Sequence, residues 1–240
     1  MTIVITDKNS LLYWYPKIKD LPIPQPRTEI YVIPEATLAK LMEENMENLD
    51  LVEVNKVAGR IGFPLFCRTD QASNKHFWDR ASYIGKIDDM KSHIFEVISH
   101  NLCADILGLP FKALVFREYI PMASEYTAFY GSMPVSPERR YFIENGKVLC
   151  HHPYWVEEAI VNPSTPNWRD LSRRMNTETP EEIELLTKHA ELVSSMFEGF
   201  WSVDFCKAKD GRWILIDMAL GEDSWHQIGC SHNRTMEYEL

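Results

Sequence analysis

Two apolar, aromatic-rich runs near the C-terminus flank the dipeptide Asp210-Gly211, and they constrain the fold more than any other feature of the chain. An Asp-Gly pair between such runs predicts a β-hairpin. A two-residue or a four-residue loop gives the same register, in which Ala208 faces Trp213 and Asp204 faces Asp217. Directly opposed residues of an antiparallel pair point to the same face, with Cβ atoms roughly 5 Å apart. The hairpin therefore predicts two adjacent carboxylates on one face of a sheet.

This pair of carboxylates favours a bound cation. At an effective dielectric constant near 20 the two charges repel by about 3 kcal/mol, and apolar neighbours such as Phe205 and Leu215 predict a largely buried sheet. Ligands that offer only oxygen favour a hard ion, so we expect Mg²⁺ or Mn²⁺ at Asp204 and Asp217. The alternative is that each aspartate pairs separately with an arginine or a lysine.

Length and composition exclude several classes of protein. The chain has 240 residues, of which 45% are hydrophobic, enough for the core of one large or two small domains. Its net charge of −10 argues against a broad nucleic-acid footprint. No apolar stretch approaches a membrane span of about 20 residues, and the N-terminus does not resemble a signal peptide. The five scattered cysteines form no CxxC pair, so we expect reduced thiols in a cytoplasmic protein without membrane contact.

The order of the expected elements indicates an α+β fold. The expected strands are Thr2–Thr6, Glu29–Ile33, Phe63–Arg68, Phe111–Ile120, Tyr126–Met133, Arg140–Leu149 with a turn at 144–147, and the two strands of the C-terminal hairpin. The expected helices are Pro34–Gly62, interrupted by a short strand at Asp50–Val54, then Met90–Leu107 ending at Gly108, and Pro180–Phe197 with Thr179 as its cap. The proline-rich segment Pro16–Pro26 is expected to be extended or looped.

Four motifs in one order resemble those of ATP-grasp enzymes. The motifs are the glycine, aromatic-proline and apolar-strand run of 59–68, the interlobe hinge strand 114–121, the strand Glu138–Ile143, and the carboxylate pair of the hairpin. The strand Glu138–Ile143 is similar to one in a divergent branch of the family. That branch includes cell-division-cycle proteins that help assemble a translation initiation factor, and small phage and bacterial proteins. The resemblance covers roughly residues 59–224.

The resemblance implies an arrangement of domains and a ligand. Residues 1–62 would form an N-terminal α/β segment, residues 63–120 the N-lobe and residues 121–240 the C-lobe of the fold. Each lobe would carry sheet and helix, and Mg-ATP would bind between the antiparallel sheets of the two lobes. Asp204 and Asp217 would bridge one or two Mg²⁺ ions to the β- and γ-phosphates.

The resemblance also assigns contacts to the phosphates. Arg68 ends its strand where the family usually has a phosphate-binding lysine, and the alternative is an ordinary surface cation. Ser73 and Lys75 lie in the loop that would cover the phosphates; because this loop contains no glycine, they would act through their side chains, and a solvated loop is the alternative. Lys86 on the next strand is a further candidate. Arg140 would direct its guanidinium at the γ-phosphate or at an acyl phosphate, while Arg139 points to the other face of its strand.

The hinge would bind the nucleoside. By resemblance, the backbone at Tyr119 and Ile120 would contact the adenine, and Glu118 would bind the sugar hydroxyls. Glu125 could share this role with Glu118. The alternative for Glu118 is a carboxylate paired with a neighbouring cation on the sheet.

One departure from the family lies two residues after Asp217. The family commonly has an asparagine ligand there, whereas this chain has Ala219, so Glu222, Asp223 or a water would have to replace it.

Two cysteine- and histidine-containing segments lack any zinc-finger spacing. They are Cys150-His151-His152 and Cys230-Ser231-His232. We expect structural or substrate-pocket roles for their histidines. His226, close to the expected metal site, could contact a substrate.

We therefore expect an Mg-ATP-dependent ligase that joins a carboxylate to an amine through an acyl phosphate. Its substrates would be small molecules or peptides, bound by the loops 122–137 and 151–176. A nucleotide-binding assembly factor for a protein partner is the second hypothesis, favoured by Ala219 and by the loop without glycine. A kinase or a nucleic-acid-repair ligase is a third, which the acidic charge disfavours.

Overall fold

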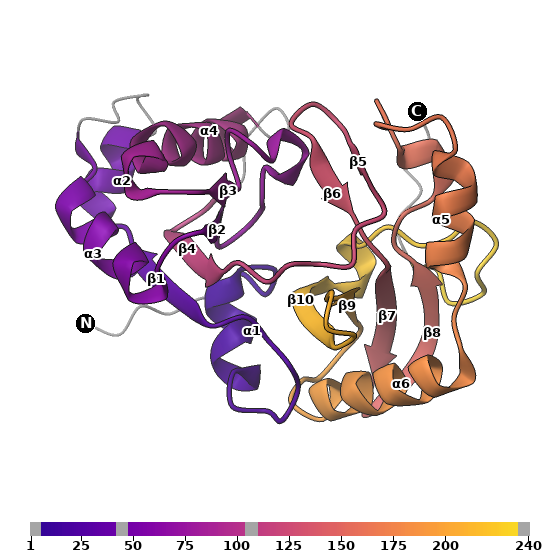
Figure 1. The fold of residues 1–240 in the computed structure, drawn as a ribbon. Coiled ribbons are helices and arrows are strands. Elements are labelled where there is room, and N and C mark those ends of the chain that lie inside the picture. The colour runs from indigo at the N-terminus through magenta and orange to yellow at the C-terminus, as the bar shows by residue number, and fades with distance from the viewer. Residues whose placement is uncertain (1–5, 42–47, 104–109, 235–240) are drawn as a thin grey trace. The chain divides into compact units, whose positions relative to one another are not determined.

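The computed structural model describes residues 6–41, 48–103 and 110–234, and Figure 1 shows its helices and strands. The chain divides into two compact units. The first unit comprises Pro26–Ile120 and Thr127–Met133, and the second comprises the described parts of Met1–Gln25, Pro121–Tyr126 and Pro134–Leu240. The chain thus leaves the first unit after Ile120, where the sequence indicates the hinge. The N-terminal residues up to Gln25 group with the C-terminal half.

The first unit is built on a four-stranded antiparallel sheet with the order β1-β4-β2-β3. Its strands are β1 (Thr28–Val32), β2 (Leu65–Thr69), β3 (Tyr83–Ile84) and β4 (Ala113–Glu118). Its helices are α2 (Glu35–Leu41), α3 (Leu51–Ile61) and α4 (Met90–Cys103), with short 3₁₀ turns η2 (Lys75–Phe77) and η3 (Ile87–Asp89).

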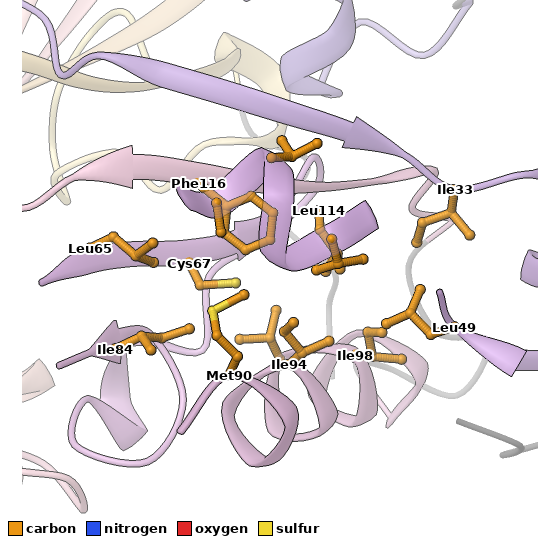
Figure 2. Close-up of a cluster of buried hydrophobic side chains, with 14 of the residues drawn as sticks. Ile33, Leu49, Leu65, Cys67, Ile84, Met90, Ile94, Ile98, Leu114 and Phe116 are labelled. Atoms are coloured by element: carbon orange, nitrogen blue, oxygen red, sulfur yellow. The ribbon is translucent and has the colours of Figure 1, made fainter. Parts of the chain in front are cut away.

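The hydrophobic core of the first unit lies between this sheet and its helices. Figure 2 shows Met90, Ile94 and Ile98 of α4 pointing at the sheet, where Cys67 and Phe116 face them. The spacing of four residues along α4 places these side chains on one face of the helix. The amphipathic pattern in the sequence is confirmed, whereas Leu107 and Gly108, expected at the end of the helix, lie outside the described residues.

The expected strand at Asp50–Val54 is wrong, because Asp50 begins helix α3. Its Oδ1 accepts hydrogen bonds from the backbone N–H groups of Val52 and Glu53, both at 3.1 Å. An aspartate in this position satisfies donors that a helix start otherwise leaves unpaired. The buried residues Val54, Val57 and Ile61 then follow at helical spacing.

The second unit carries another four-stranded antiparallel sheet, with the order β10-β9-β7-β8. Its strands are β7 (Glu138–Glu144), β8 (Lys147–Pro153), β9 (Trp201–Lys207) and β10 (Trp213–Leu220). Its helices are α1 (Leu11–Ile18), α5 (Trp168–Asn176) and α6 (Pro180–Ser194), with 3₁₀ turns η4 (Glu157–Ala159) and η5 (Gly221–Asp223). The α+β class expected from the sequence is confirmed.

The two faces of this second sheet have different roles. Helix α6 packs on β7, β8 and β9, as Figure 1 shows, and its His189 ring lies 6.2 Å from that of Phe205. Tyr141, directly opposite Val203, shares this helix-covered face with Phe205. Because side chains alternate along a strand, Arg140 and Asp204 belong to the opposite face. The packing of α6 therefore fixes which side of the sheet carries the polar residues.

Helix α6 begins as its sequence indicates. Thr179 Oγ1 accepts from the backbone N–H of Glu182, and the Glu182 carboxylate accepts from the Thr179 N–H, both at 3.2 Å. This reciprocal capping box satisfies two helix-start donors at once. The turn expected at 144–147 is also confirmed, with Asn145 and Gly146 at φ values of 52° and 79° between β7 and β8.

Two expectations about irregular segments are wrong. Helix α1 includes Pro16, although a proline in a helix disfavours it. Leu11, Trp14 and Ile18, at helical spacing, are all buried, and burial of this size outweighs the lost hydrogen bond. Residues 151–176, expected to be a loop, contain helix α5.

The single strand expected at Tyr126–Met133 is instead two short ones. These are β5 (Tyr126–Ala128) and β6 (Met133–Val135). Between them Phe129 and Ser132 take positive φ values of 66° and 52°, which no strand residue adopts. The strand expected at Thr2–Thr6 falls almost wholly outside the described residues. None of the described helices combines the length and the apolar character that a membrane crossing needs.

Candidate functional site

The β9–β10 hairpin turns through three residues rather than two or four. The Ala208 N–H donates to the Arg212 carbonyl at 2.8 Å, and the Gly211 N–H donates to the Ala208 carbonyl at 3.0 Å. Gly211 has a φ of 89°, as the last residue of such a turn requires. The register next to the turn is therefore shifted by one residue, and Trp213 pairs with Lys207 instead of Ala208.

An irregularity in β10 restores the expected pairing of the two aspartates. The register shifts between Leu215 and Asp217, so that β10 contains one extra residue at this point. Beyond the bulge, Asp217 lies directly opposite Asp204. The predicted carboxylate pair is confirmed, although the loop that was used to predict it is wrong.

The aspartate pair is part of a row of four residues that crosses the whole sheet. Asp217 on β10 lies opposite Asp204 on β9, Asp204 opposite Arg140 on β7, and Arg140 opposite His152 on β8. Directly opposed residues share a face, so all four side chains start from one side of the sheet. We call these four residues the polar row.

Within the polar row, Arg140 binds Asp204 through two hydrogen bonds. Arg140 Nε donates to Oδ1 at 2.8 Å, and Nη2 donates to Oδ2 at 2.7 Å. Burial by itself lowers the pKa of Arg140, but the charge of Asp204 and its hydrogen bonds outweigh this and raise it. The pairing with an arginine, left open by the sequence, is thus present for Asp204.

The donor set of the polar row still fits a hard cation. Each carboxylate oxygen has two lone-pair positions, and the bonds from Arg140 use one on each oxygen of Asp204. Asp217 Oδ1 accepts from the backbone N–H of Met218 at 3.1 Å, in a geometry local to the bulge. Two carboxylates on one face, one of them buried, are a donor set for Mg²⁺ or Mn²⁺.

The position of the asparagine missing from the sequence is occupied by a small residue. Ala219 lies opposite Ser202, whose hydroxyl is 2.6 Å from that of Ser224. Of the two suggested replacements, Asp223 accepts a hydrogen bond from Asn9 Nδ2 at 2.7 Å, and Glu222 is exposed.

In the first unit, Arg68 contacts the loop that follows its strand. Its Nε donates to the Thr69 carbonyl at 3.0 Å and its Nη2 to the Gln71 carbonyl at 3.2 Å. The Thr69 hydroxyl in turn accepts from the backbone N–H groups of Gln71 and Ala72. Side chains therefore hold the shape of this loop, which explains how it forms without glycine.

The remaining basic candidates of the first unit lie after β2 and β3. Ser73 and Lys75 are half-buried at the end of the loop, and Lys75 begins η2. Lys86 is exposed and precedes η3 rather than lying on a strand.

The hinge strand β4 ends at Glu118, which is paired with a cation. Arg27 Nε donates to Glu118 Oε2 at 2.8 Å, and the Glu118 N–H donates to the Arg27 carbonyl at 2.9 Å. Tyr119 and Ile120 follow, both half-buried. Glu125 belongs to the second unit and is exposed; its backbone N–H donates to Val135.

A family model decides what these features represent. The model, which describes an ATP-grasp domain and is the third family of its clade, matches residues 58–235, about three-quarters of the chain. The chain belongs to this ATP-grasp family. The family resemblance read from the sequence is thereby confirmed. None of the curated protein sequences is similar enough to this chain to count as a match.

Solved structures agree with the family assignment at the level of the fold. Cdc123 from Schizosaccharomyces pombe is similar with a TM-score of 0.56 and 15% identity, over 91% of this chain and 87% of that chain. A C-terminally truncated form of it gives a TM-score of 0.57 and 16% identity over the same shares. D-alanine–D-alanine ligase from Bacillus anthracis, complexed with ATP, gives 0.47 and 15% identity, over 88% of this chain and 52% of that one. At such identities the likeness to Cdc123 establishes a shared fold.

Within this ATP-grasp chain, an aromatic group beside the hinge was missed by the sequence analysis. The Tyr119 ring lies 5.0 Å from that of Tyr83 and 6.3 Å from that of Trp78, and Trp78 lies 5.7 Å from Phe66. Burial raises the pKa of Tyr119. No spacing in the sequence links Phe66, Trp78 and Tyr83, because they come from β2, a loop and β3. Only the pairing of the strands places them next to the hinge.

Proposed function

We propose that this ATP-grasp protein is an Mg-ATP-dependent ligase that joins a carboxylate to an amine. One observation carries the proposal: Asp204 and Asp217 lie directly opposite each other on the face of the sheet that also presents Arg140. A buried carboxylate pair beside a guanidinium combines ligands for a divalent cation with a partner for a phosphoryl group.

Each member of the polar row has a distinct task in this proposal. Asp204 and Asp217 hold Mg²⁺, which would neutralise charge on the β- and γ-phosphates. Arg140 keeps Asp204 oriented through its two hydrogen bonds and presents its guanidinium on the face that carries the acidic pair. Fixed charges of this kind stabilise a phosphoryl group without any reorganisation of the protein.

The first unit would supply the other contacts with the nucleotide. Arg68, Ser73, Lys75 and Lys86 are the proposed phosphate contacts. The backbone at Tyr119 and Ile120 would bind the adenine, and Glu118 and Glu125 the sugar hydroxyls. The aromatic group at Tyr119, Tyr83 and Trp78 supports an adenine at the hinge, since a base that stacks on an aromatic ring gains about 1–3 kcal/mol.

The proposed reaction has two steps. An oxygen of the substrate carboxylate attacks the γ-phosphorus, the bond from that phosphorus to the β,γ-bridging oxygen breaks, and ADP leaves with the electron pair. The product is an acyl phosphate. An amine then attacks its carbonyl carbon, phosphate leaves, and the nitrogen loses a proton. The protein supplies no nucleophile, so its role is to position the reactants and to stabilise charge.

Trapping of the acyl phosphate tests this function. The protein is incubated with Mg-ATP, pools of carboxylates and hydroxylamine, and hydroxamate formation is followed together with ADP. We expect both products to rise with one pool and to vanish in Asp217→Asn. ADP formed with a phosphorylated product, without hydroxamate or phosphate, would instead indicate a kinase.

A nucleotide-binding assembly factor is the second candidate, and two observations favour it. Ala219 leaves the acidic pair without a third side-chain ligand at that position, and the loop after β2 is closed on itself by Thr69 and Arg68. Both features suit nucleotide binding without rapid turnover. This candidate predicts that Mg-ATP stabilises the protein while no substrate pool stimulates ADP formation, and that one protein co-purifies with the chain.

A further inference from the structure

Two cysteines and two histidines meet at one end of the polar row. Cys150 and His152 lie on β8, and His226 and Cys230 lie in the segment that follows η5. We call these four residues the Cys/His cluster. One candidate ligand atom from each lies within 4.8 Å of the other three. Both histidines are buried and both cysteines are half-buried.

The strand supplies two of these side chains through its alternation. Cys150 and His152 are two residues apart, so both point to the same face of β8. Their partners across β7 are Phe142 and Arg140 respectively. The cluster therefore lies on the face of the sheet that α6 leaves uncovered.

The C-terminal segment supplies the other two. The His226 ring stacks on that of Phe142, with the ring centroids 3.8 Å apart. A turn follows, in which the Cys230 N–H donates to the Gln227 carbonyl at 3.1 Å and Gly229 has a φ of 82°. This turn returns the chain towards β8 and brings Cys230 beside Cys150.

The distances within the cluster are close to those of a four-coordinate metal site. Zn²⁺ binds sulfur at about 2.3 Å and imidazole nitrogen at about 2.0–2.1 Å, so a tetrahedral site spaces its ligand atoms about 3.3–3.8 Å apart. Here Cys150 Sγ lies 3.6 Å from His226 Nε2, and His152 Nε2 lies 3.2 Å from His226 Nδ1. The largest separation, within 4.8 Å, exceeds the ideal value by about 1 Å, a distance that small side-chain rotations can close.

We propose that Cys150, His152, His226 and Cys230 form a structural Zn²⁺ site. Two thiolates and two imidazoles in a tetrahedral set favour zinc over the hard cations that suit the aspartate pair. Four protein ligands leave no open position for a substrate or a water, which makes the site structural rather than catalytic. The ion is thus distinct from the cation assigned to Asp204 and Asp217.

The site would fasten the C-terminal segment to the sheet beside the polar row. Arg140 Nη1 donates to the carbonyl of Trp225, the residue before His226, at 3.3 Å. The same guanidinium holds both oxygens of Asp204. Zinc would therefore hold in place a segment whose backbone contacts Arg140, and would act as a positioning element for that arginine.

Metal content tests the proposal directly. The full chain is purified from zinc-supplemented cells without chelator or affinity metal, and its zinc is measured by elemental analysis. We expect about one zinc per chain in the wild type and less than about a tenth as much in Cys150→Ser and Cys230→Ser. The matched control is Cys103→Ser, an exposed cysteine at the end of α4, which should keep its zinc.

A titration of the wild type covers the case in which the variants do not fold. Reduced protein freed of metal is titrated with Co²⁺, whose absorption spectrum reports tetrahedral thiolate coordination, and Zn²⁺ is then added. We expect saturation at one equivalent and displacement of Co²⁺ by Zn²⁺. Chelation of zinc should lower the melting temperature of the wild type by about 5–10 °C and leave that of Cys230→Ser unchanged.

Two results would overturn the site. One is a wild type that carries no zinc and binds no Co²⁺ when reduced. The other is a Cys150–Cys230 disulfide found by mass spectrometry in protein purified under conditions that keep Cys103 reduced, because an oxidised pair cannot ligate the ion.

Discussion

Arg140 holds both carboxylate oxygens of Asp204 from the directly opposite position on the neighbouring strand, at 2.8 and 2.7 Å. The two side chains are 14% and 6% exposed, so water screens the pair very little. Removal of one partner from such a pair leaves a buried charge without compensation. The arrangement thus couples the stability of the second unit to the geometry of its proposed metal site.

We expect Arg140→Met to lower the free energy of unfolding by about 3–5 kcal/mol. The double variant Arg140→Met/Asp204→Asn should recover part of this loss, because the uncompensated charge is gone. Urea unfolding of the four proteins of the cycle measures the coupling. The control is Arg212→Met, which breaks an exposed pair with Asp210 and should cost less than about 1 kcal/mol. Equal losses in the buried and the exposed pair would contradict the assignment.

Asp217→Asn should remove metal-dependent nucleotide binding while the protein stays folded. Asp217 is half-buried and lies at the bulge of β10, so an isosteric amide keeps the packing but loses the charge that attracts the cation. At about 100-fold excess over Kd, Mg-ATP should stabilise the wild type by about 2.7 kcal/mol. Thermal unfolding with Mg-ATP and with ATP plus EDTA measures this. Asp210→Asn, in the turn of the same hairpin, should behave as the wild type; stabilisation of the wild type by ATP that ignores the metal would count against the carboxylate pair.

Glu182 should contribute stability that disappears in acid. Burial by itself raises the pKa of Glu182, but hydrogen bonds from Lys207 Nζ and from the Thr179 N–H outweigh this and lower it. Because the pKa is lower in the folded state, the unfolded chain binds more protons as the pH falls. The contribution is complete above the unfolded pKa of about 4.3 and is lost as the pH falls through the folded value.

Stability curves against pH check this. The difference in unfolding free energy between the wild type and Glu182→Gln should be constant at neutral pH and shrink below about pH 4. Lys207→Met should shrink the same difference at neutral pH, because it removes the larger of the two favourable interactions. A difference that does not change with pH would mean that Glu182 acts only as a helix cap.

Two glycines should respond to alanine in opposite directions. Gly59 is exposed within α3, and an added Cβ has nothing within 4 Å, so Gly59→Ala should stabilise the protein by about 0.5–1 kcal/mol. At Gly221 the added Cβ would overlap the ring of Phe200, in a buried position. Gly221→Ala should therefore destabilise by about 1–3 kcal/mol. Denaturant unfolding measures both, and Phe200→Leu should relieve part of the second effect.

Local signals in the sequence were sufficient wherever one element decides its own structure. The capping box at Thr179, the turn at Asn145-Gly146 and the amphipathic face of α4 all depend on residues within a few positions of one another. The Asp50 cap shows the limit of such signals. Asp50 starts a helix there, although the residues after it were also compatible with a strand.

The aspartate pair shows how a correct result can depend on a compensation that the sequence does not display. A three-residue turn moves the register by one, and the bulge before Asp217 moves it back. Bulges depend on the twist of the sheet and on the packing of neighbouring strands, so no local pattern marks them. The aromatic group at Tyr119 was missed for a similar reason, because three separate segments build it.

The sequence by itself determined the α+β class, the ATP-grasp family and the facing carboxylates of the hairpin, because periodicity, turn residues and motif order are local properties of the chain. Only the tertiary structure decided that Arg140 binds Asp204, and that Cys150 and His152 meet His226 and Cys230 across more than 70 residues. Such contacts follow from which strands pair and which face α6 covers. Burial of apolar surface over the whole unit selects that pairing.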